Sequence, residues 1–311
     1  MSYRFAWVIA LAVCMTGCAS SEEFSLPGKM VFQSDRKEDH QFGTFMLQDK
    51  QITYLGDLIS PALSPDGNKI AAYTLDTREL VISDNKGAIQ KKISIGGKPG
   101  RPLWTPDGQS IVVVNYRGYD ELGPALVMID IATAQIRTLH EVQAGCSLTY
   151  HTISPDGRRI LFTSSGGSDP KRRQVVDGLY LLDIESLHVE KIYPYLAVSG
   201  MWLPDSKHIV FDAYLGVDGR PITDLHGALL IMNIETKQIR KLHDMDFPAW
   251  DGIKLSKDGK YFYLAKNIGH GGSIIVLMPY DDPRREIHVT RSVPNWLGYS
   301  NDTKPDWWQG E

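Results

Sequence analysis

The chain has 311 residues, of which 42% are hydrophobic and 23% charged, and its formal net charge is -4. Acidic and basic residues are mixed along the sequence, which argues against a nucleic-acid surface and against a polybasic face for anionic lipid. The three cysteines, Cys14, Cys18 and Cys146, are too few for a disulfide framework.

The first 21 residues, "MSYRFAWVIALAVCMTGCASS", predict a secretory signal. Arg4 precedes an apolar run over residues 5–13, which is shorter than the roughly 20 residues that a membrane-spanning helix needs. The segment "MTGC" resembles the bacterial lipobox, although Met15 stands where leucine is usual. In a lipobox the cysteine is lipidated and becomes the mature N-terminus. The alternative is a plain signal peptide that is cleaved near Ala19.

The lipobox resemblance implies three regions: a signal peptide over residues 1–17, a lipidated tether over 18–27 and a folded body over 28–311. Acyl chains such as palmitate on Cys18 would be the protein's only membrane contact. Ala19, in place of the aspartate that signals inner-membrane retention, favours the periplasmic face of the outer membrane in a Gram-negative cell. Cys146 lies in an apolar segment and is expected to be a small buried residue.

A tight turn recurs along the body at a period that is typical of β-propeller blades. The copies are "ALSPDGNKIAAYT" at Asp66, "LWTPDGQSIVVVN" at Asp107, "TISPDGRRILFTS" at Asp156, "MWLPDSKHIVFDA" at Asp205 and "KLSKDGKYFYLAK" at Asp258. Their aspartates are separated by 41, 49, 49 and 53 residues. This spacing is typical of four-stranded propeller blades with variable loops.

The residues of the turn explain the hairpin around it. Proline presets the backbone at the second turn position, aspartate bonds its own downstream backbone, and glycine accepts the positive φ. The apolar residue before each turn, including Trp104 and Trp202, is interpreted as a packing residue. Third and fourth strands are predicted in segments such as "PALVMID" and "AQIRTLHE", and no convincing helical periodicity competes with them.

The two ends of the body are predicted to share one blade. The N-terminal piece, residues 29–55, offers three strands but no first strand with its turn. Near the other end, Tyr299 to Asp302 fall where an apolar residue and a degenerate turn would stand, while "KPDWWQGE" could lie outside the ring. The expected fold is all-β, a six-bladed propeller of four-stranded antiparallel blades, closed by pairing of N- and C-terminal strands so that no sheet edge stays free.

The repeat resembles that of the TolB-type β-propeller family, in which an apolar or Trp residue precedes Ser-Pro-Asp-Gly and a strand follows. The resemblance covers about residues 28–311 and is specific for the fold. In that family, TolB itself binds segments of envelope proteins at its propeller, so the resemblance implies an envelope protein or peptide partner, or alternatively a cell-wall glycan. Nucleic acid is not expected to be a partner.

The ligand is expected at the face opposite the repeated turns, where long loops and the segments entering the inner strands surround the channel mouth. Both charges and aromatics gather in this predicted rim, which suits a peptide or glycan. The rim comprises Arg101, Tyr119, Glu121, Tyr150, His151, Lys171, Arg172, Arg173, His226, Trp250, Asp251, His270 and Trp296.

A binding or scaffold role is favoured over an enzyme, so no catalytic residue, metal or cofactor is assigned. The alternative is a carbohydrate-active enzyme similar to oligogalacturonate lyases, in which His40, His226 and His270 would converge on a divalent metal. No HxH or HExxH pair supports that alternative. The sequence also contains no GxSxG elbow of the kind that serine hydrolases use.

Overall fold

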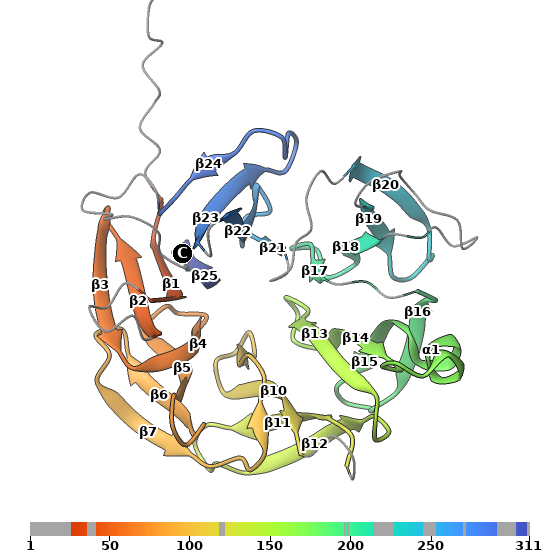
Figure 1. The fold of residues 1–311 in the computed structure, drawn as a ribbon, viewed down its shortest axis with the longest axis horizontal. Coiled ribbons are helices and arrows are strands. Elements are labelled where there is room, and N and C mark those ends of the chain that lie inside the picture. Colours follow the sequence, from red (N-terminus) through yellow and green to blue (C-terminus); the bar gives the residue numbers. More distant parts are fainter. Residues whose placement is uncertain are drawn as a thin grey trace, which may run out of the picture.

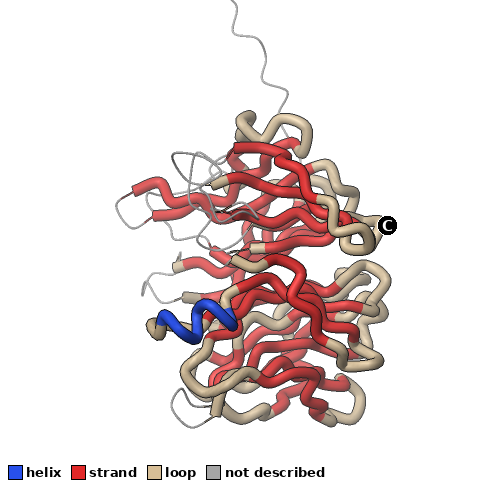
Figure 2. The backbone as a smooth tube through the Cα atoms, turned by 90° about the vertical axis from the view of Figure 1, so that its right-hand side faces the viewer, coloured by secondary structure: helices blue, strands red, loops and turns tan. Residues whose placement is uncertain are grey.

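The computed structural model describes residues 26–35, 42–117, 122–195, 197, 199–213, 215, 227–244, 253–269, 272–290 and 303–309. Within these ranges the strands form six antiparallel sheets that surround a central axis as the blades of a propeller (Figure 1). The predicted six-bladed all-β fold is therefore confirmed. Helix α1 (Pro170–Val176) projects on the face of the ring opposite the C-terminal end (Figure 2). The repeated turns lie on the C-terminal face, since Trp308 Nε1 donates to the Pro65 carbonyl of the first turn.

The blades are numbered from the N-terminus, and each begins with its innermost strand. The first blade contains β25 (Thr303–Trp308), β1 (Lys29–Ser34), β2 (Gly43–Gln48) and β3 (Gln51–Gly56). The second contains β4 (Leu58–Leu63), β5 (Lys69–Thr74), β6 (Leu80–Asp84) and β7 (Ile89–Ile93). The third contains β8 (Lys98–Pro99), β9 (Leu103–Trp104), β10 (Ser110–Tyr116), β11 (Ala125–Asp130) and β12 (Ile136–Glu141).

The other three blades follow the same order. The fourth contains β13 (Ser147–Ile153), β14 (Arg159–Ser165), β15 (Gly178–Asp183) and β16 (Val189–Tyr193). The fifth contains β17 (Gly200–Trp202), β18 (His208–Ala213), β19 (Ala228–Asn233) and β20 (Ile239–Asp244). The sixth contains β21 (Lys254–Leu255), β22 (Tyr261–Gly269), β23 (Gly272–Pro279) and β24 (Ile287–His288).

Four of the five repeated turns are closed by the same hydrogen bonds, made by a Ser or Thr hydroxyl. In the turn of the fifth blade Leu203 stands at the hydroxyl position, and the backbone bond from the Ser206 N–H to the Leu203 carbonyl matches the others. In the second blade, the Ser64 hydroxyl donates to Asp66 Oδ1 at 2.5 Å and accepts from the Lys69 backbone N–H at 2.9 Å, while the Gly67 N–H donates to the Ser64 carbonyl at 2.8 Å. The bond from the Ser64 hydroxyl contributes most to lowering the pKa of the Asp66 carboxyl, followed by the bond from the Asn68 backbone N–H. The motif satisfies the backbone groups of the reversal locally, which explains why it recurs.

Apolar residues from neighbouring blades meet in six clusters, one for each interface of the ring. Successive side chains of a strand point to opposite faces and so belong to different clusters: Met30 and Phe32 of β1 face the sixth blade, whereas Val31 between them faces the second. All three side chains are fully buried. Because each blade is apolar on both faces, an open ring would leave two such faces in water.

Strand β25 closes the ring by pairing with β1, from Lys29 opposite Trp308 to Gln33 opposite Thr303. The predicted closure is confirmed, but the position predicted for its strand was wrong. The closing strand is "TKPDWW", part of the tail that could have lain outside the ring, and Tyr299 to Asp302 precede it outside the described residues. Side-chain packing outweighs the polar appearance of this tail. Trp307 is buried between the first and sixth blades, and Trp308 Nε1 donates to the Pro65 carbonyl at 3.0 Å.

A short helix, α1 (Pro170–Val176), contains three residues of the predicted rim, where long loops and no helix were expected. Asp169 caps it by accepting a hydrogen bond from the Lys171 backbone N–H, and Pro170 stands in the first turn. An Asp-Pro pair is a helix start signal. Helical periodicity misses it because seven residues are too few to show an apolar stripe, and none of them is buried.

Candidate functional site

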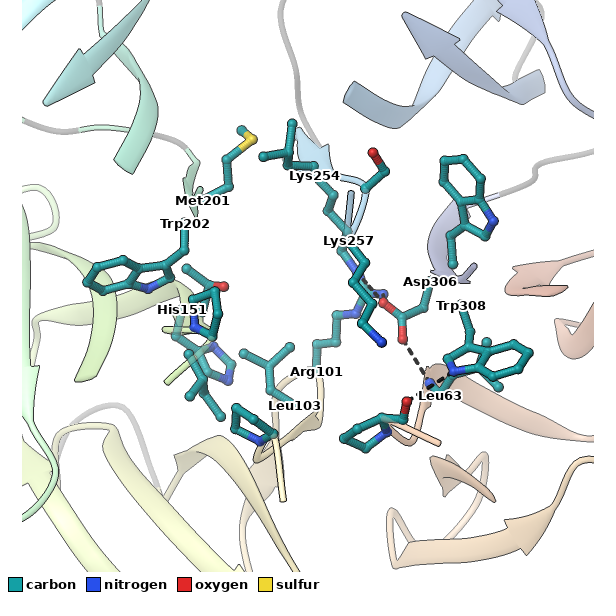
Figure 3. A pocket seen from close by; sticks show the side chains of 18 of the residues that line it. Leu63, Arg101, Leu103, His151, Met201, Trp202, Lys254, Lys257, Asp306 and Trp308 are labelled. Atoms are coloured by element: carbon teal, nitrogen blue, oxygen red, sulfur yellow. Dashed lines mark hydrogen bonds and ion pairs between the residues drawn. The ribbon is translucent and has the colours of Figure 1, made fainter. Parts of the chain in front are cut away.

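A cavity of about 760 Å³ lies in the central channel and reaches the face that carries the repeated turns. Side chains from all six blades line it (Figure 3). Ionisable side chains come from the first, third, fourth and sixth blades, and apolar groups surround them. The principal lining residues are Leu63, Pro65, Arg101, Leu103, Pro106, His151, Ile153, Pro155, Met201, Trp202, Pro204, Lys254, Leu255, Lys257, Asp306 and Trp308.

One position of the repeat supplies a lining residue in most of the blades. Leu103, Thr152, Met201 and Lys254 each stand four residues before the aspartate of their turn and all line the cavity. Asp306 holds the corresponding position in β25, because Trp307 pairs with Met30 of β1 as Leu63 pairs with Ile70 of β5. The register of the inner strands therefore brings a lysine and an aspartate together in adjacent blades.

Arg101 reaches the cavity through a break in the inner strand of the third blade. Strands β8 and β9 both pair with β10, but Arg101 and Pro102 lie between them outside the ladder, after Gly100, whose N–H donates to the Val114 carbonyl of β10 at 2.7 Å. Pro102 has no N–H to donate to a strand partner, which favours this interruption. The Arg101 side chain then crosses toward the first blade, where Nη2 donates to the Pro305 carbonyl at 2.8 Å.

Arg101, Lys254 and Asp306 form what we call the cavity ion cluster. Asp306 Oδ1 lies 3.0 Å from Lys254 Nζ and 3.4 Å from Arg101 Nη2, while its Oδ2 accepts from the Leu63 backbone N–H at 2.8 Å. The three side chains are between 14% and 22% exposed. Figure 3 shows the cluster on one side of the cavity, with Lys257 reaching over it from the turn of the sixth blade.

Burial and the excess of positive charge in the cluster both act on the pKa of Lys254. Burial, reinforced by the nearby charge of Arg101, lowers the pKa of Lys254 to about 7, against the opposing effect of Asp306. The pKa of the Asp306 carboxyl is also below its usual value: burial would raise it, but Lys254 and Arg101 together outweigh burial. Asp306 therefore stays ionised and only part of the cationic charge is neutralised.

Three buried nitrogens in the cavity wall have no hydrogen-bond partner among the described residues: Arg101 Nε, His151 Nε2 and Trp202 Nε1. His151 is 8% exposed and Trp202 is 6% exposed. Burial lowers the pKa of His151 to about 4, so its ring is neutral at physiological pH. An unpaired buried polar group costs on the order of 1–3 kcal/mol, so three around one cavity indicate a surface suited to polar groups of a ligand.

The repeated turns form an apolar collar around the mouth. Its residues are Pro65, Pro106, Pro155 and Pro204, one from each of four turns. In the sixth blade Lys257 stands at the same turn position and brings a charge into the collar. The turns were expected to be structural only, with ligands at the opposite face, yet they border the cavity that the structure describes.

The predicted rim divides into three groups. Arg101 and His151 line the cavity, while Lys171, Arg172 and Arg173 lie on α1 at the outer edge of the fourth blade, away from the channel (Figure 1). Tyr150 belongs to β13, but its side chain is not described. The remaining rim residues lie outside the described residues: Tyr119, Glu121, His226, Trp250, Asp251, His270 and Trp296.

Sequence reasoning missed Lys254, Lys257 and Asp306, and gave Trp202 only a packing role. Trp202 does pack in the core between the fourth and fifth blades, but it also borders the cavity. A signal for Lys254 was present: when the blades are aligned on the turn aspartate, it is the only charged residue among the five at the fourth preceding position. No comparable signal existed for Asp306, because its strand lacks the turn.

A metal site was also tested against the structure. Among the described residues, no three His, Cys, Asp or Glu side chains are grouped to hold a metal ion. Of the described residues that line the cavity, His151 and Asp306 alone are of these types, fewer than the three or four protein ligands of a typical divalent site. His40, His226 and His270 lie outside the described residues.

The N-terminal predictions concern residues before the described part of the chain. Cys18 and the signal segment lie outside it. Cys146, the free cysteine within it, is buried as expected. None of the helices in the described ranges is long and apolar enough to span a membrane.

Comparison with known proteins supports the fold. No protein-family model matches the sequence, and no curated protein sequence matches it either. Among solved structures, TolB from Acinetobacter baumannii matches with a TM-score of 0.66 at 18% identity, over 90% of this chain and 66% of that one, just under two thirds of its length. An oligogalacturonate lyase in complex with manganese matches with a TM-score of 0.61 at 16% identity, over 88% of this chain and 76% of that one.

A third structure shows how widely the architecture is shared. The nidogen/laminin complex matches with a TM-score of 0.59 at 9% identity, over 91% of this chain and all of the matched chain. Identities of 9% to 18% establish a common fold and no common activity. The chain is a six-bladed β-propeller that is structurally similar to the propeller of TolB.

Proposed function

We propose that this protein is a membrane-anchored binding lipoprotein of the cell envelope, at the periplasmic face of the outer membrane, whose propeller holds part of an envelope protein, a peptide or a glycan. The observation that carries the proposal is the central cavity, in which three buried nitrogens have no partner among the described residues. Enclosed, partly apolar cavities with a few convergent polar groups are the usual form of ligand sites.

The proposed anchor is compatible with where the fold begins. Strand β1 starts at Lys29, eleven residues after Cys18. A fully extended tether of that length spans about 35 Å, so the ring would work close to its membrane. Metabolic labelling with a palmitate analogue tests the anchor: label should enter the wild-type protein and be absent from Cys18→Ser. Labelling that persists in this variant would contradict lipidation at Cys18.

Site-specific photo-crosslinking in the intact envelope tests whether the cavity is the binding site. A benzoylphenylalanine at Leu103, which lines the cavity, should give discrete adducts. The matched control is the same residue at Val175 on α1, which is 70% exposed but lies at the outer edge. Adducts from Val175 with none from Leu103 would place the partner elsewhere and contradict the proposal.

A second candidate, an eliminating carbohydrate lyase, is favoured by one feature of the cavity ion cluster. Arg101 is suited to neutralise the carboxylate of a uronic acid, and Lys254, with a pKa of about 7, is suited to accept a proton beside it. Incubation with oligogalacturonate, followed by absorbance of the unsaturated product, tests this activity. Metal analysis of the purified protein and of His226→Ala and His270→Ala variants tests its metal dependence. Turnover that is lost in Lys254→Met would replace the binding role with the enzymatic one.

A further inference from the structure

The cavity ion cluster and Lys257 leave positive charge available to a ligand. Arg101, Lys254 and Lys257 face one carboxylate, Asp306, among the described residues that line the cavity. Arg101 directs Nη2 to Asp306 and to the Pro305 carbonyl, whereas its Nε is buried without a partner. The Nε edge of a guanidinium is one of the positions from which arginine binds a second carboxylate.

The opposite wall offers one acceptor and one donor. His151 hydrogen-bonds to the backbone of Val112 and Thr149, while its Nε2 has no partner. In the neutral ring this assigns the proton to Nδ1 and makes Nε2 an acceptor. Trp202 Nε1 carries a hydrogen and can only donate. Figure 3 shows both rings across the cavity from the cavity ion cluster.

Between these two walls and the mouth, the lining is apolar. Four prolines form the collar, and Leu103, Ile153 and Leu255 line the cavity beside them. A ligand that fits must therefore combine four features: a negative group, an N–H or O–H donor, an acceptor and an apolar group. The last residue of a peptide carries this set, in its carboxylate, its backbone N–H, the preceding carbonyl and its side chain.

We propose that the cavity captures the free C-terminus of an extended peptide whose last side chain is apolar. This inference rests on the proposed binding function and names its ligand. The terminal carboxylate lies between Arg101, Lys254 and Lys257, the last backbone N–H donates to His151 Nε2, and the preceding carbonyl accepts from Trp202 Nε1. The terminal side chain packs against the apolar lining. A uronic acid shares the carboxylate but has no group for the apolar lining.

The test is calorimetric titration of the full mature protein with defined probes. These are N-acetyl-Ala-Ala-Ala-Leu with a free carboxylate, the same peptide as its C-terminal amide, the free acid ending in Ser, and tri-galacturonate. The Leu acid should bind at least about 10-fold more tightly than its amide, because hydrogen bonds to a charged group are lost in the amide. It should also bind several-fold more tightly than the Ser acid.

Variants assign the effect to the cavity. Arg101→Met should lower the affinity for the Leu acid by about 10-fold to 100-fold. Lys257→Gln, at an exposed position of the turn, should weaken it several-fold with an unchanged melting temperature. Asp306→Asn should tighten binding, because the competing carboxylate is removed. Lys171→Met, which removes a cation from α1, is the matched control and should leave binding unchanged.

Each outcome separates this inference from the function on which it rests. Equal affinity for acid and amide, or no binding of any peptide, overturns the C-terminal inference, even where adducts from Leu103 support the binding function. Binding of tri-galacturonate without binding of the Leu acid overturns it in favour of a glycan. Weaker binding by Asp306→Asn, with the fold retained, would also contradict the proposed place of the carboxylate.

Discussion

Lys254 and Asp306 occupy corresponding positions in neighbouring blades, and their side chains meet at 3.0 Å inside the central cavity. One comes from the sixth blade and the other from the C-terminal strand that completes the first. Closing the ring and completing the candidate site are therefore the same structural event. A change at either residue should affect both stability and binding.

Asp306→Ala should destabilise the fold by about 2–4 kcal/mol, because it leaves Lys254 and Arg101 without their carboxylate in a largely buried site. Urea denaturation measures this change. The control is Asp244→Ala, which removes an ion pair with Lys241 whose side chains are 50% and 59% exposed. That change should stay within about 0.5 kcal/mol. Equal effects of the two variants would mean that the cavity ion cluster contributes no more than a surface pair.

The stability of the protein should rise as the pH increases from about 7 toward 10. Folded Lys254 releases its proton near pH 7, whereas in the unfolded chain it does so near 10.5. Between these values the unfolded state binds more protons, so the free energy of unfolding increases with pH. The groups that face Lys254 are Arg101, Asp306 and the Tyr263 ring, with Lys257 and His151 nearby.

Denaturant titrations at several pH values, on wild type and Lys254→Met, check this. The variant should lose most of the rise, because methionine keeps the buried stem but carries no titrating group. If the free energy of unfolding rises equally with pH in both proteins, groups other than Lys254 cause the rise.

Trp307→Ala should lower the free energy of unfolding by about 3–5 kcal/mol, as expected for truncating a buried tryptophan. Trp307 is 7% exposed, packs on Tyr263 and donates from Nε1 to the Pro27 carbonyl at 2.8 Å. Because it joins both termini to the sixth blade, hydrogen exchange should increase first in β1 and β25. Leu187→Ala, at a side chain that is 41% exposed, serves as the control and should change stability by less than about 0.5 kcal/mol.

Gly67→Ala and Gly96→Ala separate backbone strain from steric contact. Both glycines have nearly the same positive φ, 68° and 67°. A Cβ at Gly67 would lie 2.6 Å from the Trp308 ring, whereas nothing lies within 4 Å of one at Gly96. Gly96→Ala should lower the free energy of unfolding by about 1 kcal/mol. Gly67→Ala should lower it by clearly more, because Trp308 must also shift. Thermal unfolding gives the comparison, and equal losses would refute the contact with the closing strand.

The predicted rim on α1 can be tested separately from the cavity. Because the proposed binding site is the cavity, we expect a triple variant, Lys171→Ala with Arg172→Ala and Arg173→Ala, to keep its partners in a pulldown from envelope extract; loss of partners would support the α1 part of the predicted rim. Arg101→Met provides the comparison at the cavity. A partner set that is unchanged in the triple variant and altered in Arg101→Met would confine binding to the cavity and remove α1 from the rim.

The local sequence was sufficient to predict the blades. Ser64, Asp66 and Gly67 close their turn with hydrogen bonds that span at most five residues, so such turns and their hairpins can be recognised in isolation. The alternation that buries Met30 on one face and Val31 on the other is also local. Helix α1 was not predicted, because its start signal was short and its residues are all at least partly exposed.

The amino-acid sequence by itself determined the repeated turn, the four strands of each blade and the need for six blades in a closed ring, since hydrogen bonds and side-chain alternation over a few residues specify them. Only the tertiary structure decided that Thr303–Trp308 is the closing strand, and that Asp306 meets Lys254 and Arg101. Residues far apart along the chain carry no local mark of their pairing. The pairing is decided by the register of β25 on β1 and by the packing of Trp307 and Trp308 against the neighbouring blades. Both exist only once the blades pack around one axis.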